Sequence, residues 1–307
     1  MTGVGERVRL FKIARAVLAR GGNMIEHLTG KEGVDRRLAI EIAYALQSGS
    51  YTRYAATPTA IATRRESHAI LEPLLREHDC HTLLDCGAGE GTRWLDFAGE
   101  LRLLTLLDAS WSRLAQAPRH LETLPGVSQY RLIKGDMKAL PFAQASFDAV
   151  FTSHAVEPNT DEDAAAIVAS LFRQAGRLVV MFEPNYRAAH TAMRTRMERH
   201  GYARNIWDVA FAQPGWTNVC EGRMEVSPNE DNHTSYMAFR RDDPVTVPHP
   251  RYRDPASGLL LHAHAGALAD EAGCMAYPMV GGIACLGAED AIFIGDANVA
   301  VNGSVEV

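Results

Sequence analysis

Thr82-Leu83-Leu84-Asp85-Cys86-Gly87-Ala88-Gly89-Glu90-Gly91 is the stretch that decides the fold of this 307-residue chain. Its short apolar run ends in a carboxylate and predicts a buried parallel strand. The three glycines at alternate positions predict a tight turn at which the backbone closely approaches a ligand. A second apolar run, 103–107, ends at Asp108, and a carboxylate there is placed to bind a ribose diol. The two runs together predict a nucleoside cofactor.

The spacing of the glycines indicates which class of nucleoside cofactor the loop would bind. A dinucleotide fingerprint reads G-x-G-x-x-G/A and directs backbone N–H groups at a pyrophosphate. Here the glycines stand at 87, 89 and 91, and Thr92 occupies the third position of that fingerprint. Asp85 would repel a pyrophosphate but suits the ammonium group of an amino acid. No lysine follows the loop, which excludes a P-loop, although a Gly-rich turn can also be an ordinary strand-to-helix turn.

The loop resembles the first motif of the class I S-adenosylmethionine-dependent methyltransferases, whose glycines face the methionine half of the cofactor. Further strands are predicted at 131–136, 146–154 and 176–184, and each ends in polar residues near the same sheet edge. The resemblance covers residues 80–185, and the Pro-Phe…Ser-Phe-Asp run at 141–148 is typical of the small-molecule branch. It implies an α/β fold with a Rossmann-like, seven-stranded sheet, and S-adenosyl-L-methionine as the cofactor.

The same resemblance implies which residues hold the cofactor. Asp108 would hold the ribose, Asp136 would accept the adenine amino group, and the apolar residue that follows Asp136 would pack on the ring. The expected cofactor residues are Asp85, Gly87, Gly89, Asp108, Ala109, Asp136, Met137 and Ser153.

His154 follows the fourth strand and is the candidate catalytic residue. Methyl transfer is an in-line displacement at a sulfonium carbon, so positioning supplies much of the acceleration, and a general base is needed only when the acceptor must first lose a proton. The alternative is that His154 begins a helix and bonds to the backbone. The segment 153–159 also lacks the N/D-P-P-Y/F/W motif, which argues against exocyclic or amide nitrogen acceptors.

Residues around the expected acceptor position come from two parts of the chain. A first group, at 51–54, belongs to an expected N-terminal cap, where the side chains could instead pack between cap and sheet. A second group follows the fourth and fifth strands. The expected acceptor-binding residues are Tyr51, Arg53, Tyr54, Glu157, Glu183, Asn185 and Tyr186.

Three domains are expected along the chain. Residues 1–78 have helical apolar patterning and would form an N-terminal helical cap. Residues 79–243 would form the cofactor domain, closed by antiparallel strands at 223–226 and 234–240. Residues 244–307 would form a small, β-rich, ribbon-like C-terminal domain. Tyr277-Pro278 and Gly282-Ile283 in this tail resemble the small zinc-ribbon protein that activates several RNA- and protein-modifying methyltransferases.

The ribbon-like tail has lost most of the cysteines of that zinc protein. Asp254 and Ser257 stand in place of the first cysteine pair, and only Cys274 remains of the second. A tetrahedral zinc site needs four sulfur or nitrogen ligands, so we expect no metal. Packing against the methyltransferase body or a second subunit would then hold the tail.

Composition limits the classes of partner. A net charge of −6 gives no basic footprint for nucleic acid, and no apolar run is long enough to cross a membrane. The charged start of the chain is unlike a secretory signal, and five scattered cysteines are typical of a cytoplasmic protein. We therefore expect a cytoplasmic methyltransferase, with a homodimer as one assembly to test, acting on a natural-product, sugar or amino-acid-derived small molecule. The alternatives are a peptide or RNA methyltransferase with a fused activator-like tail, and a non-catalytic cofactor-binding protein.

Overall fold

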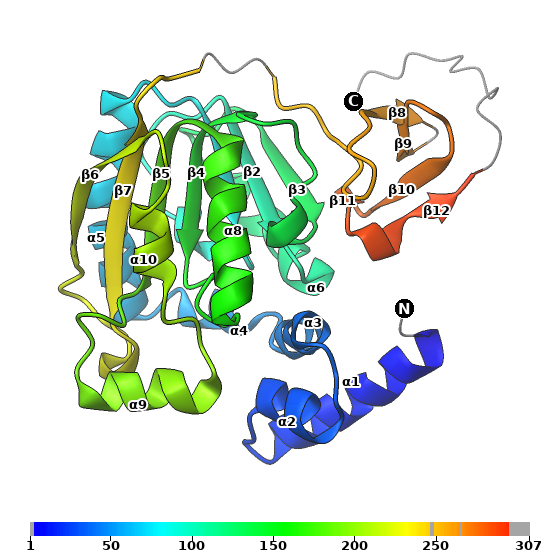
Figure 1. Cartoon of the computed structure of the whole chain (residues 1–307), viewed down its shortest axis with the longest axis horizontal. Helices are drawn as coiled ribbons and strands as arrows, with labels where there is room; N and C mark the ends of the chain where they lie inside the picture. The colour runs from blue at the N-terminus through cyan, green and yellow to red at the C-terminus, as the bar shows by residue number, and fades with distance from the viewer. Residues whose placement is uncertain (1–2, 246–248, 265, 295–307) are drawn as a thin grey trace.

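A mixed β-sheet runs through the centre of the molecule, with the strand order β6-β7-β5-β4-β1-β2-β3-β11-β10-β9-β8 (Figure 1). The computed structural model describes residues 3–245, 249–264 and 266–294. The strands are β1 (Thr82–Cys86), β2 (Leu103–Asp108), β3 (Tyr130–Lys134), β4 (Phe147–Ser153), β5 (Ala175–Pro184), β6 (Trp216–Arg223), β7 (Thr234–Arg241), β8 (Leu261–His264), β9 (Ala267–Asp270), β10 (Met275–Val280), β11 (Ile283–Cys285) and β12 (Ile292–Phe293). The helices are α1 (Val4–Ala19), α2 (Met24–Lys31), α3 (Arg36–Leu46), α4 (Ser50–Tyr54), α5 (Pro58–Glu77), α6 (Trp111–Leu114), α7 (Pro118–Leu121), α8 (Asp161–Gln174), α9 (Thr191–His200) and α10 (Ile206–Phe211).

Strands β1 to β5 form the parallel centre of the sheet. β1 lies between β2 and β4, and β3 and β5 pair outside them in the same direction. β1 and β2 are buried at every position, as expected for strands covered on both faces. Because parallel strands end at one edge, Asp85, Asp108 and Asp136 gather there. The expected Rossmann-like, seven-stranded fold is confirmed by the strands from β6 to β3.

The antiparallel pair β6 and β7 closes one side of this sheet, next to β5. The prediction for β7 agrees with the structure, but the prediction of its partner at 223–226 was wrong, because β6 covers Trp216–Arg223. β6 is an edge strand whose residues are all partly or fully exposed, so burial leaves little apolar pattern in its sequence. Trp216 belongs to this strand and packs edge-on against Phe172.

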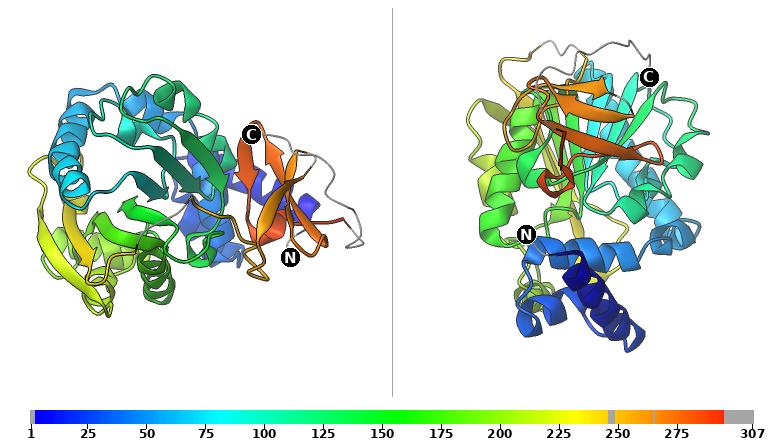
Figure 2. Two further views of the ribbon diagram at one scale, coloured as in Figure 1. Left: turned by 90° about the horizontal axis from the view of Figure 1, so that it is seen from above. Right: turned by 90° about the vertical axis from the view of Figure 1, so that its right-hand side faces the viewer.

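Helices cover both faces of the sheet. α5 covers one face, and α8 and α10 cover the other (Figure 2). Leu71 and Leu75 of α5 share a buried cluster with Leu83 and Leu104 of the sheet. The residues of α8 and α10 share a second cluster with the other face. This three-layer arrangement is the α/β architecture that the sequence predicts.

The helices α1 to α3 form a small apolar cluster of their own at the carboxyl edge of the strands (Figure 1). Asn23 and Asp35 cap α2 and α3, because their side chains accept hydrogen bonds from the first free backbone N–H groups. The prediction of N-terminal helices is confirmed. No helix in the described ranges is both long and apolar enough to span a membrane.

The tail continues the main sheet. β8, β9 and β10 are antiparallel neighbours, β12 pairs with β10, and β11 follows β10. β11 then pairs in parallel with β3, so that Ile283 lies opposite Leu132 and Cys285 opposite Lys134. Residues 295–307 of the expected C-terminal domain lie outside the described residues.

Candidate active site

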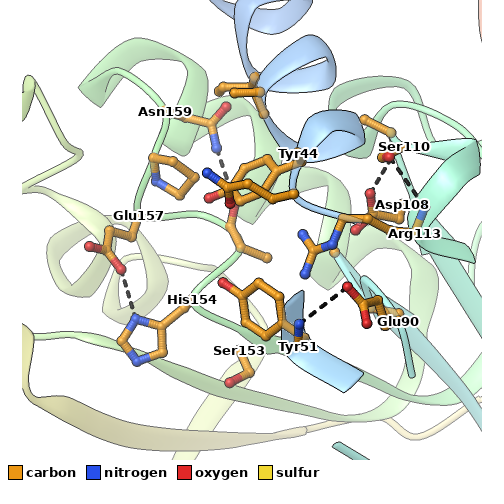
Figure 3. Close-up of a pocket in the computed structure, with 18 of the residues that line it drawn as sticks. Tyr44, Tyr51, Glu90, Asp108, Ser110, Arg113, Ser153, His154, Glu157 and Asn159 are labelled. Atoms are coloured by element: carbon orange, nitrogen blue, oxygen red, sulfur yellow. Dashed lines mark hydrogen bonds and ion pairs between the residues drawn. The ribbon is translucent and has the colours of Figure 1, made fainter. Parts of the chain in front are cut away.

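A cavity of about 630 Å³ lies where the carboxyl ends of the strands meet the N-terminal helices. Its volume is within the range of sites that hold small molecules. Its walls come from the loops after β1, β2, β3 and β4 and from α3, α4 and α5. Figure 3 shows side chains from the sheet edge and from the cap pointing into the same space.

The glycine loop after β1 forms the tight turn that the sequence predicts. Gly87 has φ +77°, and a Cβ atom there would lie 2.2 Å from the Cβ of Ala155. The backbone N–H groups of Gly87 and Ala88 both donate to the carbonyl of Leu107, which fixes the loop against β2. Gly89 has φ +58° and does not itself line the cavity. A side chain at Gly87 would therefore disrupt the loop, and the bare backbone leaves room for a ligand.

Asp85 and Asp108 are buried carboxyl groups at the bottom of the cavity. Burial raises the pKa of Asp85 to about 7, although the indole N–H of Trp94 donates to it at 2.7 Å. Asp108 accepts the backbone N–H groups of Gly89 and Ser110, each at 2.8 Å. These two hydrogen bonds hold the Asp108 carboxylate in one orientation at the end of β2.

Asp136 follows β3 and lies on the cavity wall beside Met137. One of its oxygens accepts the backbone N–H of Lys138 at 2.9 Å. The other lies 3.7 Å from Nε of Arg37, which comes from α3 of the cap. Ala109 and Ser153 also line the cavity. The structure thus brings every expected cofactor residue except Gly89 to its wall.

Glu90 ties the glycine loop to the cap, a contact that the sequence analysis missed. It is only 1% exposed and accepts the backbone N–H groups of Gly49 and Thr52 at 2.8 and 2.7 Å, and the Thr52 hydroxyl at 2.6 Å. These groups lie at the start of α4, so a carboxylate satisfies donors that the helix leaves free. α4 holds Tyr51 and Tyr54 at the cavity, whereas Arg53 is not among the lining residues.

Arg113 is a second residue of the cavity that the sequence analysis missed. Its guanidinium lies between the rings of Tyr44 and Tyr51, 4.8 and 4.5 Å from their centroids (Figure 3). It is 8% exposed and donates no side-chain hydrogen bond to any residue that the structure describes. Burial lowers its pKa, but Asp108 and the two tyrosines outweigh burial and raise it above the ordinary value. Nothing in the local sequence marks this arginine, since an arginine in a short helix is ordinarily exposed.

His154 lines the cavity from the end of β4 and has both ring nitrogens engaged. Nδ1 lies 2.7 Å from a carboxylate oxygen of Glu157, and Nε2 lies 2.7 Å from the hydroxyl of Thr234. Burial lowers the pKa of His154, but the hydrogen bond and charge of Glu157, together with Glu183, raise it overall above its ordinary value. Glu157 also lies 3.3 Å from Arg196 and accepts a hydrogen bond from Asn232.

Besides Arg53, three more of the expected acceptor residues lie away from the cavity wall. Glu183 is fully buried and accepts the backbone N–H groups of residues 155, 156 and 157, so it shapes the loop that holds His154. Asn185 lines a separate, smaller cavity of about 340 Å³. The hydroxyl of Tyr186 donates to Glu198 at 2.6 Å. Among the described residues, no three His, Cys, Asp or Glu side chains are grouped as a metal site would require.

Residues 83–176, from β1 to the start of β5, match the model of a protein family described as a methyltransferase domain. They form an S-adenosylmethionine-dependent methyltransferase domain. Magnesium protoporphyrin IX methyltransferase from Synechocystis, solved with S-adenosylhomocysteine, aligns with a TM-score of 0.51 at 12% identity, over 65% of this chain and 98% of that chain. This likeness confirms the fold of the methyltransferase domain. The N-methyltransferase NodS from Bradyrhizobium japonicum aligns with a TM-score of 0.49 at 16% identity, over 62% of this chain and 90% of that chain. No curated protein matches the chain.

Proposed function

We propose that this protein transfers a methyl group from S-adenosylmethionine to a small-molecule acceptor, such as a natural product, a sugar or an amino-acid derivative. The observation that carries the proposal is that the cap and the sheet edge line one cavity. Tyr51 and Tyr54 of α4 share it with Asp108 and His154, so the cap limits the size of any acceptor. The net charge of −6 supports a small molecule over a nucleic acid.

The residues at the sheet edge fit this cofactor. Asp108 would accept the ribose hydroxyl groups and Asp136 the adenine amino group, while Met137 and Ala109 would flank the ring. The open backbone at Gly87 would lie beside the methionine part, together with Asp85 and Ser153. When bound, the cofactor supplies a methyl group activated by its sulfonium. The protein then has to exclude water and align the acceptor with that methyl group.

His154 is the proposed general base for an acceptor that must lose a proton. In the neutral imidazole, Nδ1–H donates to Glu157, and the free lone pair on Nε2 accepts the hydroxyl proton of Thr234. An acceptor hydroxyl or amine that displaces Thr234 could lose its proton to that lone pair. Glu157 would then be an orienting residue, and its hydrogen bond and charge raise the pKa of His154, which makes the imidazole a stronger base. If both nitrogens instead donate, His154 is a charged structural residue and catalysis rests on positioning.

The test of the proposed function is product formation. The purified protein would be incubated with S-adenosylmethionine and a panel of small acceptors, and mass spectrometry would follow methylated product and S-adenosylhomocysteine together. We expect both to appear with at least one acceptor class, and to form about tenfold more slowly in Asp108→Asn when S-adenosylmethionine is below saturation. Calorimetry with S-adenosylhomocysteine is the second arm, because a wild-type protein that fails to bind it contradicts the proposal without reference to any acceptor.

For the tail, we propose that hydrogen bonds and packing take the place of a zinc site. Asp254, which stands where the expected resemblance to a zinc ribbon would place a cysteine, accepts the hydroxyl groups of Ser257 and Tyr277, both at 2.6 Å. It also accepts the backbone N–H of Ala256. These contacts join the two ends of the ribbon-like segment as a shared metal would. All five cysteines are free thiols, which supports a reducing, cytoplasmic setting.

A further inference from the structure

The pairing of β11 with β3 carries the tail to the ligand edge of the sheet. Because the two strands are parallel, the chain leaves β11 at the same edge at which β3 ends. The N–H of Leu286 donates to the carbonyl of Lys134 at 2.7 Å, and a short 3₁₀ turn, Ala288–Asp290, follows. Glu289 and Asp290 therefore lie close to the expected adenine residue, Asp136, although they are more than 150 residues away in sequence.

A buried lysine anchors this turn. Nζ of Lys134 lies 2.7 Å from Asp290, 3.3 Å from Glu289 and 3.9 Å from Glu41 of α3. Lys134 is only 8% exposed, so its charge needs these carboxylates around it. Burial lowers the pKa of Lys134, but the three carboxylates outweigh burial and raise it overall. The tail, the sheet and the cap meet at this one ammonium group.

Arg37 of the cap is shared between the tail and the cofactor site. Its Nη1 donates to Glu289 at 2.9 Å, whereas its Nε lies 3.7 Å from Asp136. The first distance is a charge-assisted hydrogen bond, and the second is an ion pair that is too long for one. Two carboxylates thus compete for one guanidinium, and Glu289 of the tail holds it more closely.

We propose that Glu289 is a positioning residue that holds Arg37 away from Asp136 and so leaves a carboxylate oxygen of Asp136 available to the adenine amino group. This inference rests on the adenine role proposed above for Asp136. Without the Glu289 charge, the planar guanidinium of Arg37 turns fully to Asp136, where it can donate two parallel hydrogen bonds. Arg37 then competes with the cofactor for the same oxygen.

The experiment measures binding of two ligands by calorimetry: S-adenosylhomocysteine and its deaminated analogue, which carries a carbonyl oxygen in place of the adenine amino group. We expect the wild-type protein to bind S-adenosylhomocysteine about tenfold more tightly than the analogue, as one hydrogen bond to a charged group allows. Glu289→Gln should weaken S-adenosylhomocysteine binding by about fivefold and leave the analogue within about twofold. In an Arg37→Met background, Glu289→Gln should change neither affinity by more than about twofold.

Controls separate this effect from general damage to the tail. Glu271→Gln removes an exposed tail carboxylate that makes no side-chain hydrogen bond or ion pair with the described residues, and it should change neither affinity. Equal weakening of both ligands by Glu289→Gln would mean a structural role and would overturn the inference, as would an undiminished effect in the Arg37→Met background. A wild-type protein that binds the two ligands equally would contradict the role of Asp136, and the inference with it. That failure is visible before any variant is made.

Discussion

Asp108 offers the most direct test at the scale of a single residue. Asp108→Asn keeps the size of the side chain but removes the charge that two backbone N–H groups and the proposed ribose diol share. Hydrogen bonds to charged groups are worth about 1.5–3 kcal/mol. We therefore expect the affinity for S-adenosylhomocysteine, measured by calorimetry, to fall by about tenfold or more. Asp243→Asn, at an exposed position, is the matched control, and an unchanged affinity in Asp108→Asn would refute the ribose role.

His154 gives a second residue-scale prediction, in which activity and stability depend on pH in opposite ways. Its folded pKa is raised above the ordinary 6.5, because Glu157 and Glu183 outweigh burial. The imidazolium contribution to stability is therefore fully present below the unfolded pKa and is lost as pH rises through the raised folded pKa. A general base works only when neutral, so kcat/KM should instead rise over that window.

The variant His154→Gln separates the two roles of this side chain. As a base, its loss should lower turnover by about 10²–10⁴ with little change in cofactor affinity. It should also remove the rise of kcat/KM with pH that follows deprotonation of His154. The control His262→Gln, in the tail, should change neither turnover nor this pH dependence. A loss of turnover below about threefold, with the pH profile kept, would assign His154 a purely structural role.

At the scale of an element, α4 depends on Glu90. A helix of five residues is not stable alone, and a single buried carboxylate holds its first N–H groups. Glu90→Gln should lower the free energy of unfolding by about 1–3 kcal/mol and speed hydrogen exchange at the amides of Gly49 and Thr52. The control Glu100→Gln, at an exposed position of the same domain, should change neither the free energy of unfolding nor the hydrogen exchange of these amides. Unchanged exchange in Glu90→Gln would show that other contacts hold the cap.

The strands and the cofactor loop could be predicted because their patterns are local. β1 and β2 are apolar runs that carry Asp85 and Asp108 near their ends, β3 is followed by Asp136, and parallel strands place those ends together. The prediction misplaced β6 because this edge strand buries no side chain completely, and its sequence therefore lacks the apolar alternation of a half-buried strand. Tyr51 and Tyr54, three positions apart, share one side of α4, whereas Arg53 takes a different direction.

The residues that the sequence could not reveal act across long distances along the chain. Glu90 accepts hydrogen bonds from residues about 40 positions earlier in the chain, and Glu289 accepts one from Arg37, 252 positions away. Arg113 lies buried at the cavity, against two tyrosines of the cap. Nothing in the neighbouring sequence of these three residues encodes their partners, which only the packing of cap, sheet and tail brings together.

At the scale of the whole molecule, the tail protects the edge of the sheet. Truncation after Asp243 would leave the outer edge of β3, opposite β2, unpaired and Lys134 without Glu289 and Asp290. Unpaired edges promote association between chains, so we expect aggregation or a changed oligomeric state by light scattering.

Metal analysis of the full chain should find less than about 0.1 zinc per chain, and a strong chelator should leave Tm unchanged. Stoichiometric zinc, or a truncated chain as stable and active as the full one, would contradict this role of the tail.

The parallel pairing of β11 with β3 also sets an order of assembly. A chain leaves the ribosome from its N-terminus, and domains tend to fold as they emerge. β1 to β5 are all made before residue 185, but the strand that completes the β3 side is made about 100 residues later. The turn that holds Arg37 is made after that strand. A nascent chain would therefore form the ribose end of its site early and the adenine end only after residues 283–290 have been made.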